Sequence, residues 1–284
     1  MIKIGVTEGD TGVAGELIRL LVNHPEADIV FVHSPANYGT KVSDVHRGLY
    51  GDTELVFDNN VSLDKIDVLF CCNTTGVAKG IFDGIEIPED LKIIDFSDEN
   101  RLKGLNNSFI YGLPELNRRA TCTAKYVSNP GSVATCVTLA LLPLAKHGLI
   151  AGDISISTVM SRTVENIVDS KNCDSPIVMD NSFNADFLEE VCQSLSQLQK
   201  DFDANIEMTT YKANFERGVL STVTFSTDKN VAELLSMYEN YYAEDSFVHI
   251  SDRQSDLLDV IRTNKCIVSI TKNKDKVVIT SCID

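Results

Sequence analysis

Short apolar runs alternate with a helix-like pattern over the first half of the chain. Mostly apolar runs of five to seven residues, typical of strands buried on both faces, occupy residues 2–6, 28–33, 66–72 and 91–96. A segment with helical spacing, residues 16–22, follows the first run and ends before a histidine-proline pair. Strands that alternate with helices build a parallel sheet with right-handed crossovers. We therefore expect residues 1–148 to form an α/β domain on a Rossmann-type, doubly wound parallel sheet.

The pattern changes after Gly148. Five strand-like stretches follow, at residues 154–159, 206–211, 219–225, 266–271 and 276–282. Two segments with helical periodicity, residues 185–198 and 231–242, separate them, and residues 169–182 form a polar segment that predicts a loop. Runs of strands near short turns are typical of an antiparallel or mixed sheet with helices on one face. We expect residues 149–284 to form a second, α+β domain.

Composition excludes several classes of function. The 284 residues include 25 Lys and Arg against 41 Asp and Glu, and the net charge of −16 opposes binding to nucleic acid or an anionic membrane. No apolar run approaches the roughly 20 residues that span a bilayer, and the first residues predict a strand rather than a signal peptide. Eight scattered cysteines without a C-x-x-C pair predict reduced thiols, and five dispersed histidines predict no metal site. These features predict a cytoplasmic protein.

A glycine-rich segment joins the first strand to the first helix. Its sequence, Gly-Asp-Thr-Gly-Val-Ala-Gly at residues 9–15, has the pattern G-x-x-G-x-x-G. A dinucleotide pyrophosphate rests at this position on backbone amides and a helix N-terminus. The alternative is a merely tight turn. The cofactor-binding residues that we predict here are Gly9, Asp10, Thr11, Gly12, Val13 and Gly15.

The end of the second strand indicates which dinucleotide is bound. It lacks the acidic residue that would hold a ribose 2′-hydroxyl, and instead reads Val32-His33-Ser34, followed by Asn37 and Lys41. Small polar residues and a lysine tolerate a 2′-phosphate. The sequence therefore favours NADP over NAD, with Ser34 and Lys41 as further cofactor-binding residues.

Asn129-Pro130-Gly131-Ser132 places a small polar side chain at the start of a long apolar helix. The segment follows a strand-like run, residues 124–127, and precedes helical spacing over residues 133–146. Unpaired N–H groups in the first helical turn would stabilise the thiolate of a cysteine. A serine hydroxyl at position 132 needs a strong neighbouring base before it can attack. Ser132 is therefore a doubtful nucleophile, and its alternative role is that of a helix cap or first-turn residue.

The chain resembles the N-acetyl-γ-glutamyl-phosphate reductases, which are related in architecture to aspartate-semialdehyde dehydrogenase. The segments that carry the resemblance are Gly15-Glu16-Leu17-Ile18-Arg19-Leu20-Leu21, Asp44-Val45-His46-Arg47-Gly48-Leu49-Tyr50-Gly51, Tyr111-Gly112-Leu113-Pro114-Glu115-Leu116-Asn117, Asn129-Pro130-Gly131 and Thr263-Asn264-Lys265-Cys266. Tyr-Gly-Leu-Pro-Glu-Leu and Asn-Pro-Gly, in this order and about fifteen residues apart, are specific together.

The resemblance implies NADPH-dependent reduction of N-acetyl-glutamyl phosphate to its semialdehyde, a step of arginine biosynthesis. A thiolate at position 132 would attack the acyl phosphate, phosphate would leave, and NADPH would reduce the thioester. A histidine of the second domain, near the start of the helical segment 185–198, would act as acid and base. The resemblance also implies that Asn129 and Arg217 bind the small-molecule substrate, and that the second domain supports a homodimer or homotetramer.

The sequence departs from the family pattern in four places. Ser132 stands where the resemblance implies a cysteine, and no histidine occurs between His147 and His249. The segment 158–164, where the family has a glycine-rich substrate loop, contains no glycine, and the family's C-terminal helix would follow Asp284. We expect a reductase whose reaction is impaired or lost. The alternative is a non-catalytic nucleotide-binding or regulatory relative that associates with a true reductase.

Overall fold

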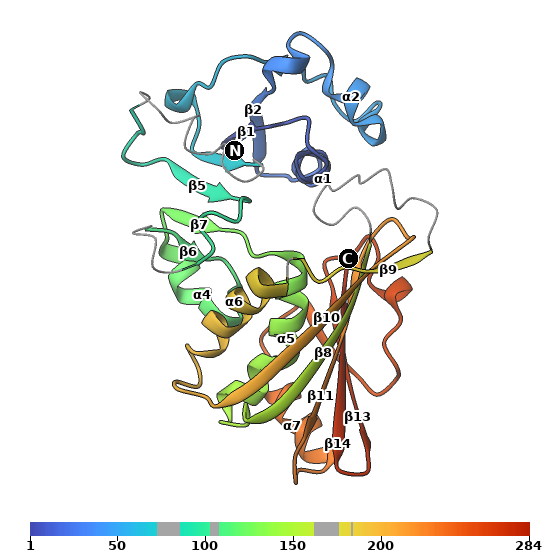
Figure 1. The fold of residues 1–284 in the computed structure, drawn as a ribbon. Coiled ribbons are helices and arrows are strands. Elements are labelled where there is room, and N and C mark those ends of the chain that lie inside the picture. Colours follow the sequence, from blue (N-terminus) through green and yellow to red (C-terminus); the bar gives the residue numbers. More distant parts are fainter. Residues whose placement is uncertain (73–85, 103–107, 162–175, 183) are drawn as a thin grey trace. The chain divides into compact units, whose positions relative to one another are not determined.

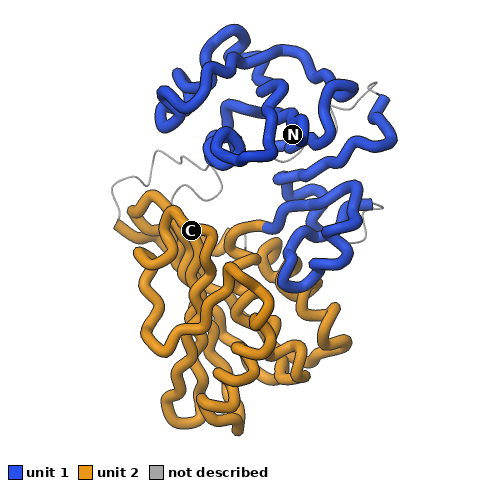
Figure 2. Tube along the Cα trace, turned by 180° about the vertical axis from the view of Figure 1, so that it is seen from behind, with its two compact units in different colours: residues 1–130 blue, residues 131–284 orange. Residues whose placement is uncertain are grey.

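The computed structural model describes residues 1–72, 86–102, 108–161, 176–182 and 184–284 (Figure 1). The chain divides into two compact units, Met1–Pro130 and Gly131–Asp284, and each unit contains one seven-stranded sheet (Figure 2). The predicted boundary after residue 148 differs from this division. The reason is the helix α5 (Ser132–Lys146), which packs against the second sheet and therefore belongs to the second unit.

The first sheet is entirely parallel and has the strand order β3-β2-β1-β4-β5-β7-β6. Its strands are β1 (Ile2–Thr7), β2 (Ala27–His33), β3 (Phe57–Asp58), β4 (Val68–Cys71), β5 (Lys92–Asp95), β6 (Ile110–Tyr111) and β7 (Tyr126–Ser128). In the described part of this unit the helices are α1 (Gly12–Leu21), α2 (Val42–Val45) and α4 (Pro114–Thr123), with 3-10 turns at Pro35–Asn37, Arg47–Leu49 and Leu63–Lys65. The order reverses between β1 and β4, the place where open α/β sheets bind ligands. The predicted Rossmann-type sheet is confirmed.

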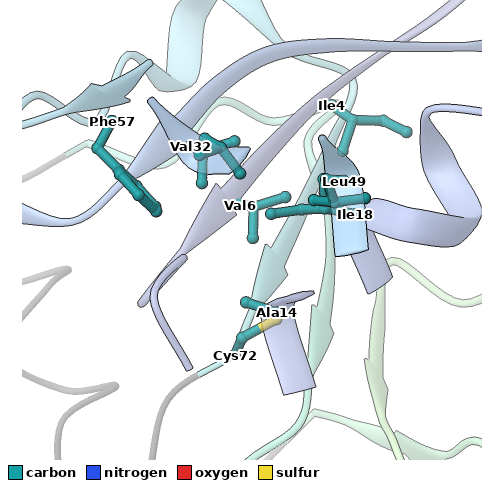
Figure 3. Close-up of a cluster of buried hydrophobic side chains, with 9 residues drawn as sticks. Ile4, Val6, Ala14, Ile18, Val32, Leu49, Phe57 and Cys72 are labelled. Carbon is teal, nitrogen blue, oxygen red and sulfur yellow. The ribbon is translucent and has the colours of Figure 1, made fainter. Parts of the chain in front are cut away.

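Helix α1 covers one face of this sheet through an apolar stripe. Ala14 and Ile18, four residues apart, are fully buried and pack over Ile4 and Val6 of β1 (Figure 3). On the opposite face Gly5 makes room for Phe31, because a Cβ at Gly5 would lie 2.4 Å from the Phe31 ring. Close packing on both faces fixes the carboxyl end of β1, from which the glycine-rich loop begins.

The second sheet is mixed and has the order β12-β13-β14-β11-β8-β10-β9. Its strands are β8 (Gly152–Ser161), β9 (Ile177–Met179), β10 (Ala204–Ala213), β11 (Val219–Ser226), β12 (Val248–Ser251), β13 (Cys266–Asn273) and β14 (Lys276–Ile283). The β8–β10 and β12–β13 pairs are parallel and the other pairs antiparallel. Besides α5, the unit contains α6 (Asn184–Leu195), α7 (Val231–Tyr241) and a 3-10 turn, Leu257–Asp259.

This architecture confirms the predicted second fold class, with one difference in detail. Residues 169–175 of the predicted loop 169–182 lie outside the described residues. Its later part contains the short edge strand β9, which pairs with β10. Three residues with half-exposed or exposed side chains are too few to give a recognisable periodicity.

Helix α5 lies beneath the second sheet and is buried along nearly its whole length, from Val133 to Ala145. Pro143 lies inside it and has no N–H, so the carbonyl of Leu139 loses its partner in the helical ladder. The hydroxyl of Tyr242, which follows α7, donates to that carbonyl at 2.5 Å. A hydrogen bond from a neighbouring element thus replaces the one that the proline removes.

The next carbonyl is bound in the same way. The Tyr238 hydroxyl donates to Ala140 O at 2.5 Å, and burial raises the pKa of this phenol well above its usual value. Unlike Leu139, Ala140 faces a residue with an N–H one turn later, Leu144. The two tyrosines therefore differ in how much the helix depends on them. None of the helices in the described parts of the chain is long and apolar enough to cross a membrane.

We predict that Tyr242→Phe lowers the free energy of unfolding by about 1–3 kcal/mol, because it leaves a buried carbonyl unpaired. Pro143→Ala in the Tyr242→Phe background should recover part of that loss, since alanine supplies an N–H to Leu139 O. Tyr238→Phe is the matched control and should cost less. Urea unfolding of the unmodified chain, the double variant and the single variants Tyr242→Phe, Pro143→Ala and Tyr238→Phe measures the coupling. Additive effects of Tyr242→Phe and Pro143→Ala would refute it.

Candidate functional site

The glycine-rich loop leads into helix α1, and Thr11 caps the N-terminus of this helix. The Thr11 hydroxyl accepts from Ala14 N at 3.2 Å and donates to Glu8 O at 2.9 Å. Gly12 and Val13, the first residues of α1, are exposed. Because the first N–H groups of a helix have no partner within it, these two amides are available to an anion.

Two glycines of the loop are required by packing. A Cβ at Gly9 would lie 2.2 Å from Val32 Cγ1, and one at Gly15 would lie 2.5 Å from His46 Nδ1. The other nitrogen of the His46 ring, Nε2, lies 2.7 Å from Gly9 O. His46 therefore holds the loop against the body of the unit, and Gly12 is the glycine left to face a ligand.

Of the two residues predicted at the end of β2, Ser34 lies beside the glycine-rich loop and Lys41 is bound elsewhere. Asn37 Nδ2 donates to Asp10 Oδ2 at 2.9 Å and to Ser34 Oγ at 3.2 Å, so Ser34 lies beside the loop. Lys41 instead forms an exposed ion pair with Glu54, with Nζ and Oε2 2.6 Å apart. The end of β2 therefore carries polar groups, while the predicted lysine is engaged elsewhere.

Sequence reasoning passed over His33 as a functional residue. Its side chain is buried, and Nδ1 has no hydrogen-bond partner. Burial lowers the pKa of this imidazole, and the carboxylates of Glu8, Asp58 and Asp10 act in the opposite direction. A histidine at the end of a predicted strand, next to the glycine-rich loop, is the signal that could have identified it.

In the second unit, Ser132 is the first residue of α5, as predicted. Its side chain is half-buried, and within the described residues its hydroxyl makes no hydrogen bond. The Glu190 carboxylate, from α6, accepts a hydrogen bond from Gly131 N at 3.2 Å, and Glu190 is only 4% exposed. A buried carboxyl group thus lies at the N-terminus of α5. Sequence reasoning missed Glu190, although an acidic residue on the buried face of a predicted helix was a usable signal.

The start of α6 is fixed by amides and hydroxyls. Asn184 Nδ2 donates to Met208 O at 2.7 Å, and Asn184 Oδ1 accepts from the Thr210 hydroxyl at 2.5 Å. The Thr210 N–H donates to Asn181 Oδ1 at 3.0 Å. At the segment where the resemblance implies an acid-base histidine, these side chains bind the neighbouring strand and have no proton to exchange near neutral pH.

The two predicted substrate-binding residues, Arg217 and Asn129, are held by hydrogen bonds to other residues of the chain. Arg217 forms a bidentate ion pair with Asp284, through Nε at 3.0 Å and Nη2 at 2.7 Å. Asn129 is held by its backbone, because its N–H donates to Asp95 O at 2.7 Å and its carbonyl accepts from Arg101 Nε at 3.0 Å. The Arg217 guanidinium is therefore already bound to a carboxylate of its own chain.

The thiols and possible metal ligands can be surveyed only in the described residues. The cysteines that the structure describes are all free thiols. In the same residues, no group of three or more His, Cys, Asp or Glu side chains could hold a metal ion. Of the segment 158–164, where the resemblance implies a substrate loop, residues 162–164 lie outside the described part.

Comparison with known proteins accounts for both units. Residues 4–124 match the family model for the NAD-binding domain of semialdehyde dehydrogenases, and residues 133–284 match the model for their dimerisation domain. Among solved structures, aspartate semialdehyde dehydrogenase II from Vibrio cholerae has a TM-score of 0.75 at 12% identity, covering 100% of this chain and 93% of that one. The NADP complex of the Candida albicans enzyme has a TM-score of 0.72 at 16% identity, covering 99% and 93%. These likenesses show a shared fold.

Closer relatives identify the family. N-acetyl-gamma-glutamyl-phosphate reductases from Bacteroides thetaiotaomicron and Phocaeicola vulgatus are 47% and 46% identical to the chain, over 100% of its length and 90% of theirs. The reductase from Christiangramia forsetii is 34% identical over the same shares. The resemblance noted in the sequence is thereby confirmed, and the chain belongs to the N-acetyl-γ-glutamyl-phosphate reductase family.

Proposed function

We propose that this family member binds NADP and has lost most of the reductase reaction. The observation that carries the proposal is the N-terminus of α5, where a serine without a hydrogen-bond partner among the described residues lies next to a buried carboxylate. If the chain has no turnover, its remaining role would be that of a non-catalytic, nucleotide-binding or regulatory subunit that associates with a true reductase.

The chemistry of a covalent reductase requires a good nucleophile and a good hydride acceptor. A thiolate supplies both, because a cysteine thiol ionises near neutral pH and a thioester accepts hydride more readily than an oxygen ester. A serine hydroxyl ionises only with the help of a base, and no histidine occurs between residues 147 and 249. Loss of one member of a catalytic unit typically costs about 10⁴-fold or more in rate.

The electrostatics at Ser132 add to this loss. A helix N-terminus favours negative charge, which would help an alkoxide or an oxyanion to form at position 132. The Glu190 carboxylate already accepts one N–H at that terminus, on Gly131. Its charge would oppose a second negative charge nearby, at low dielectric in particular.

Nucleotide binding is supported separately. The exposed amides of Gly12 and Val13 at the N-terminus of α1 could hold a pyrophosphate, and Ser34 lies beside the loop, where an adenosine ribose would be expected. Bound NADPH would supply the hydride. The loop carboxylates of Glu8 and Asp10 would act against a phosphate, so the amides must provide most of the affinity.

A homodimer or homotetramer formed through the second sheet is part of the proposal. Ile156, Val223 and Ile279 lie in one row across β8, β11 and β14 and are buried toward the helices. Their neighbours Ser157, Thr222 and Thr280 lie in the next row, on the other face, and keep partial exposure. This face, which carries small polar side chains in that row, belongs to the part of the chain that matches a dimerisation domain.

The first prediction concerns turnover. The unmodified chain should reduce NADP with N-acetylglutamate semialdehyde and phosphate at least about 10⁴-fold more slowly than a family member that has the cysteine. Ser132→Cys alone should not restore the family rate, because no histidine is supplied with it. Absorbance at 340 nm measures both rates, and ordinary turnover by the unmodified chain would refute the proposed loss.

The second prediction concerns charge at α5. In the Ser132→Cys variant, a further Glu190→Gln substitution should lower the pKa of the introduced thiol, because it removes a neighbouring negative charge. The pH dependence of iodoacetamide labelling, followed by mass spectrometry of the peptide that contains position 132, measures this pKa. Glu189→Gln is the control for a carboxylate on the same helix. An unchanged thiol pKa would show that Glu190 does not act on residue 132.

The third prediction concerns assembly. Thr222→Arg should convert an oligomer to a monomer, because it places a charge at the centre of the uncovered face. Ser236→Arg, on the exposed side of α7, introduces the same charge and should leave the assembly unchanged. Light scattering after gel filtration distinguishes the two. A monomeric unmodified chain, or a Thr222→Arg variant of unchanged mass, would contradict the proposed interface.

A further inference from the structure

The end of β2 carries a buried histidine that has no established role. His33 is 8% exposed, and its Nδ1 atom makes no hydrogen bond within the described structure. A buried polar atom without a partner costs free energy, so native proteins rarely keep one without a reason. The residue lies directly against the nucleotide loop, because its carbonyl accepts from Gly9 N at 2.8 Å.

Acidic groups approach this histidine from two elements. Glu8 and Asp10 come from the loop between β1 and α1, and Asp58 comes from β3, where it pairs in register with His33. Lys41, the first basic residue of the segment that follows His33, is bound to Glu54. The other histidine at the loop, His46, contacts the Gly9 carbonyl. His33 is therefore a titratable group that can gain a positive charge among these carboxylates.

We propose that His33 couples the choice of dinucleotide to pH. NADP binds with uptake of a proton by the His33 imidazole, which offsets the charge of the 2′-phosphate, whereas NAD binds without it. This inference rests on the proposed nucleotide binding at the loop and adds a regulatory property to it.

The direction of the effect follows from linkage. Burial lowers the pKa of His33 in the free protein, so the imidazole is neutral at pH 7. A phosphate dianion nearby favours the charged form and raises the pKa in the complex. A group whose pKa rises on binding takes up a proton, so affinity increases as pH falls through the interval between its two pKa values. One proton changes the affinity by at most about tenfold per pH unit.

The test is a calorimetric titration of the full chain with NADP and with NAD at pH 6 and pH 8. NADP should bind at least about fivefold more tightly at pH 6, whereas the affinity for NAD should change less than about twofold. At pH 7, titrations in two buffers of different ionisation enthalpy should show net proton uptake with NADP. Circular dichroism at both pH values checks that the fold is retained.

The variant His33→Gln separates the histidine from the ligand. The 2′-phosphate has its own ionisation near pH 6, so some dependence on pH remains with any protein. His33→Gln should remove most of the difference between the two pH values, and His24→Gln, at an exposed position, should not. If His33→Gln does not fold, the proton uptake of the unmodified chain decides.

The outcomes distinguish the two proposals. NADP binding with the same affinity at both pH values, or an equal effect in His33→Gln, would overturn the role of His33 and leave nucleotide binding intact. Failure of both dinucleotides to bind at either pH would overturn nucleotide binding itself, and the inference with it.

Discussion

The burial of α5 is the constraint on which the second unit and its candidate site depend. Nearly every side chain from Val133 to Ala145 is enclosed by the second sheet and its two partner helices. A helix packed on all sides cannot shift without opening cavities, so the position of its first residue, Ser132, is fixed. The Tyr242 hydroxyl preserves this packing where Pro143 interrupts the ladder. The scaffold that would present a nucleophile is therefore complete.

The chemistry at the N-terminus of α5 differs from the pattern that the family resemblance implies. A helix N-terminus has the same partial positive charge whatever residue begins the helix, and here the Glu190 carboxylate meets it at Gly131. The side chain at position 132 is a neutral hydroxyl, and the start of α6 offers amides rather than an imidazole. Geometry and stability can be retained in a family while the reacting groups are replaced, because different side chains supply them.

Strongly periodic elements could be predicted from sequence, and long-range partners could not. The longer strands of both sheets and the helices α6 and α7 follow from apolar spacing, whereas short strands such as β3, β6 and β9 do not. Helix α5 was predicted, but it is apolar on every side, and no periodicity tells which of two sheets it joins. The change of pattern after residue 148 therefore predicts a later boundary than the division after residue 130. The Glu190 contact with Gly131 spans 59 residues and the Arg217 pair with Asp284 spans 67, so neither is visible in a local pattern. Lys41 suited a phosphate by type, yet Glu54 lies within reach and engages it.

The central claim is that Ser132 does not form the covalent acyl-enzyme on which the family's reaction depends. Intact-mass spectrometry after incubation with freshly prepared N-acetyl-γ-glutamyl phosphate, without reduced cofactor, tests this step alone. We predict an unchanged mass for this chain, under conditions in which a family member with the cysteine gains one acyl group. An acyl adduct that fragmentation maps to Ser132 would contradict the account.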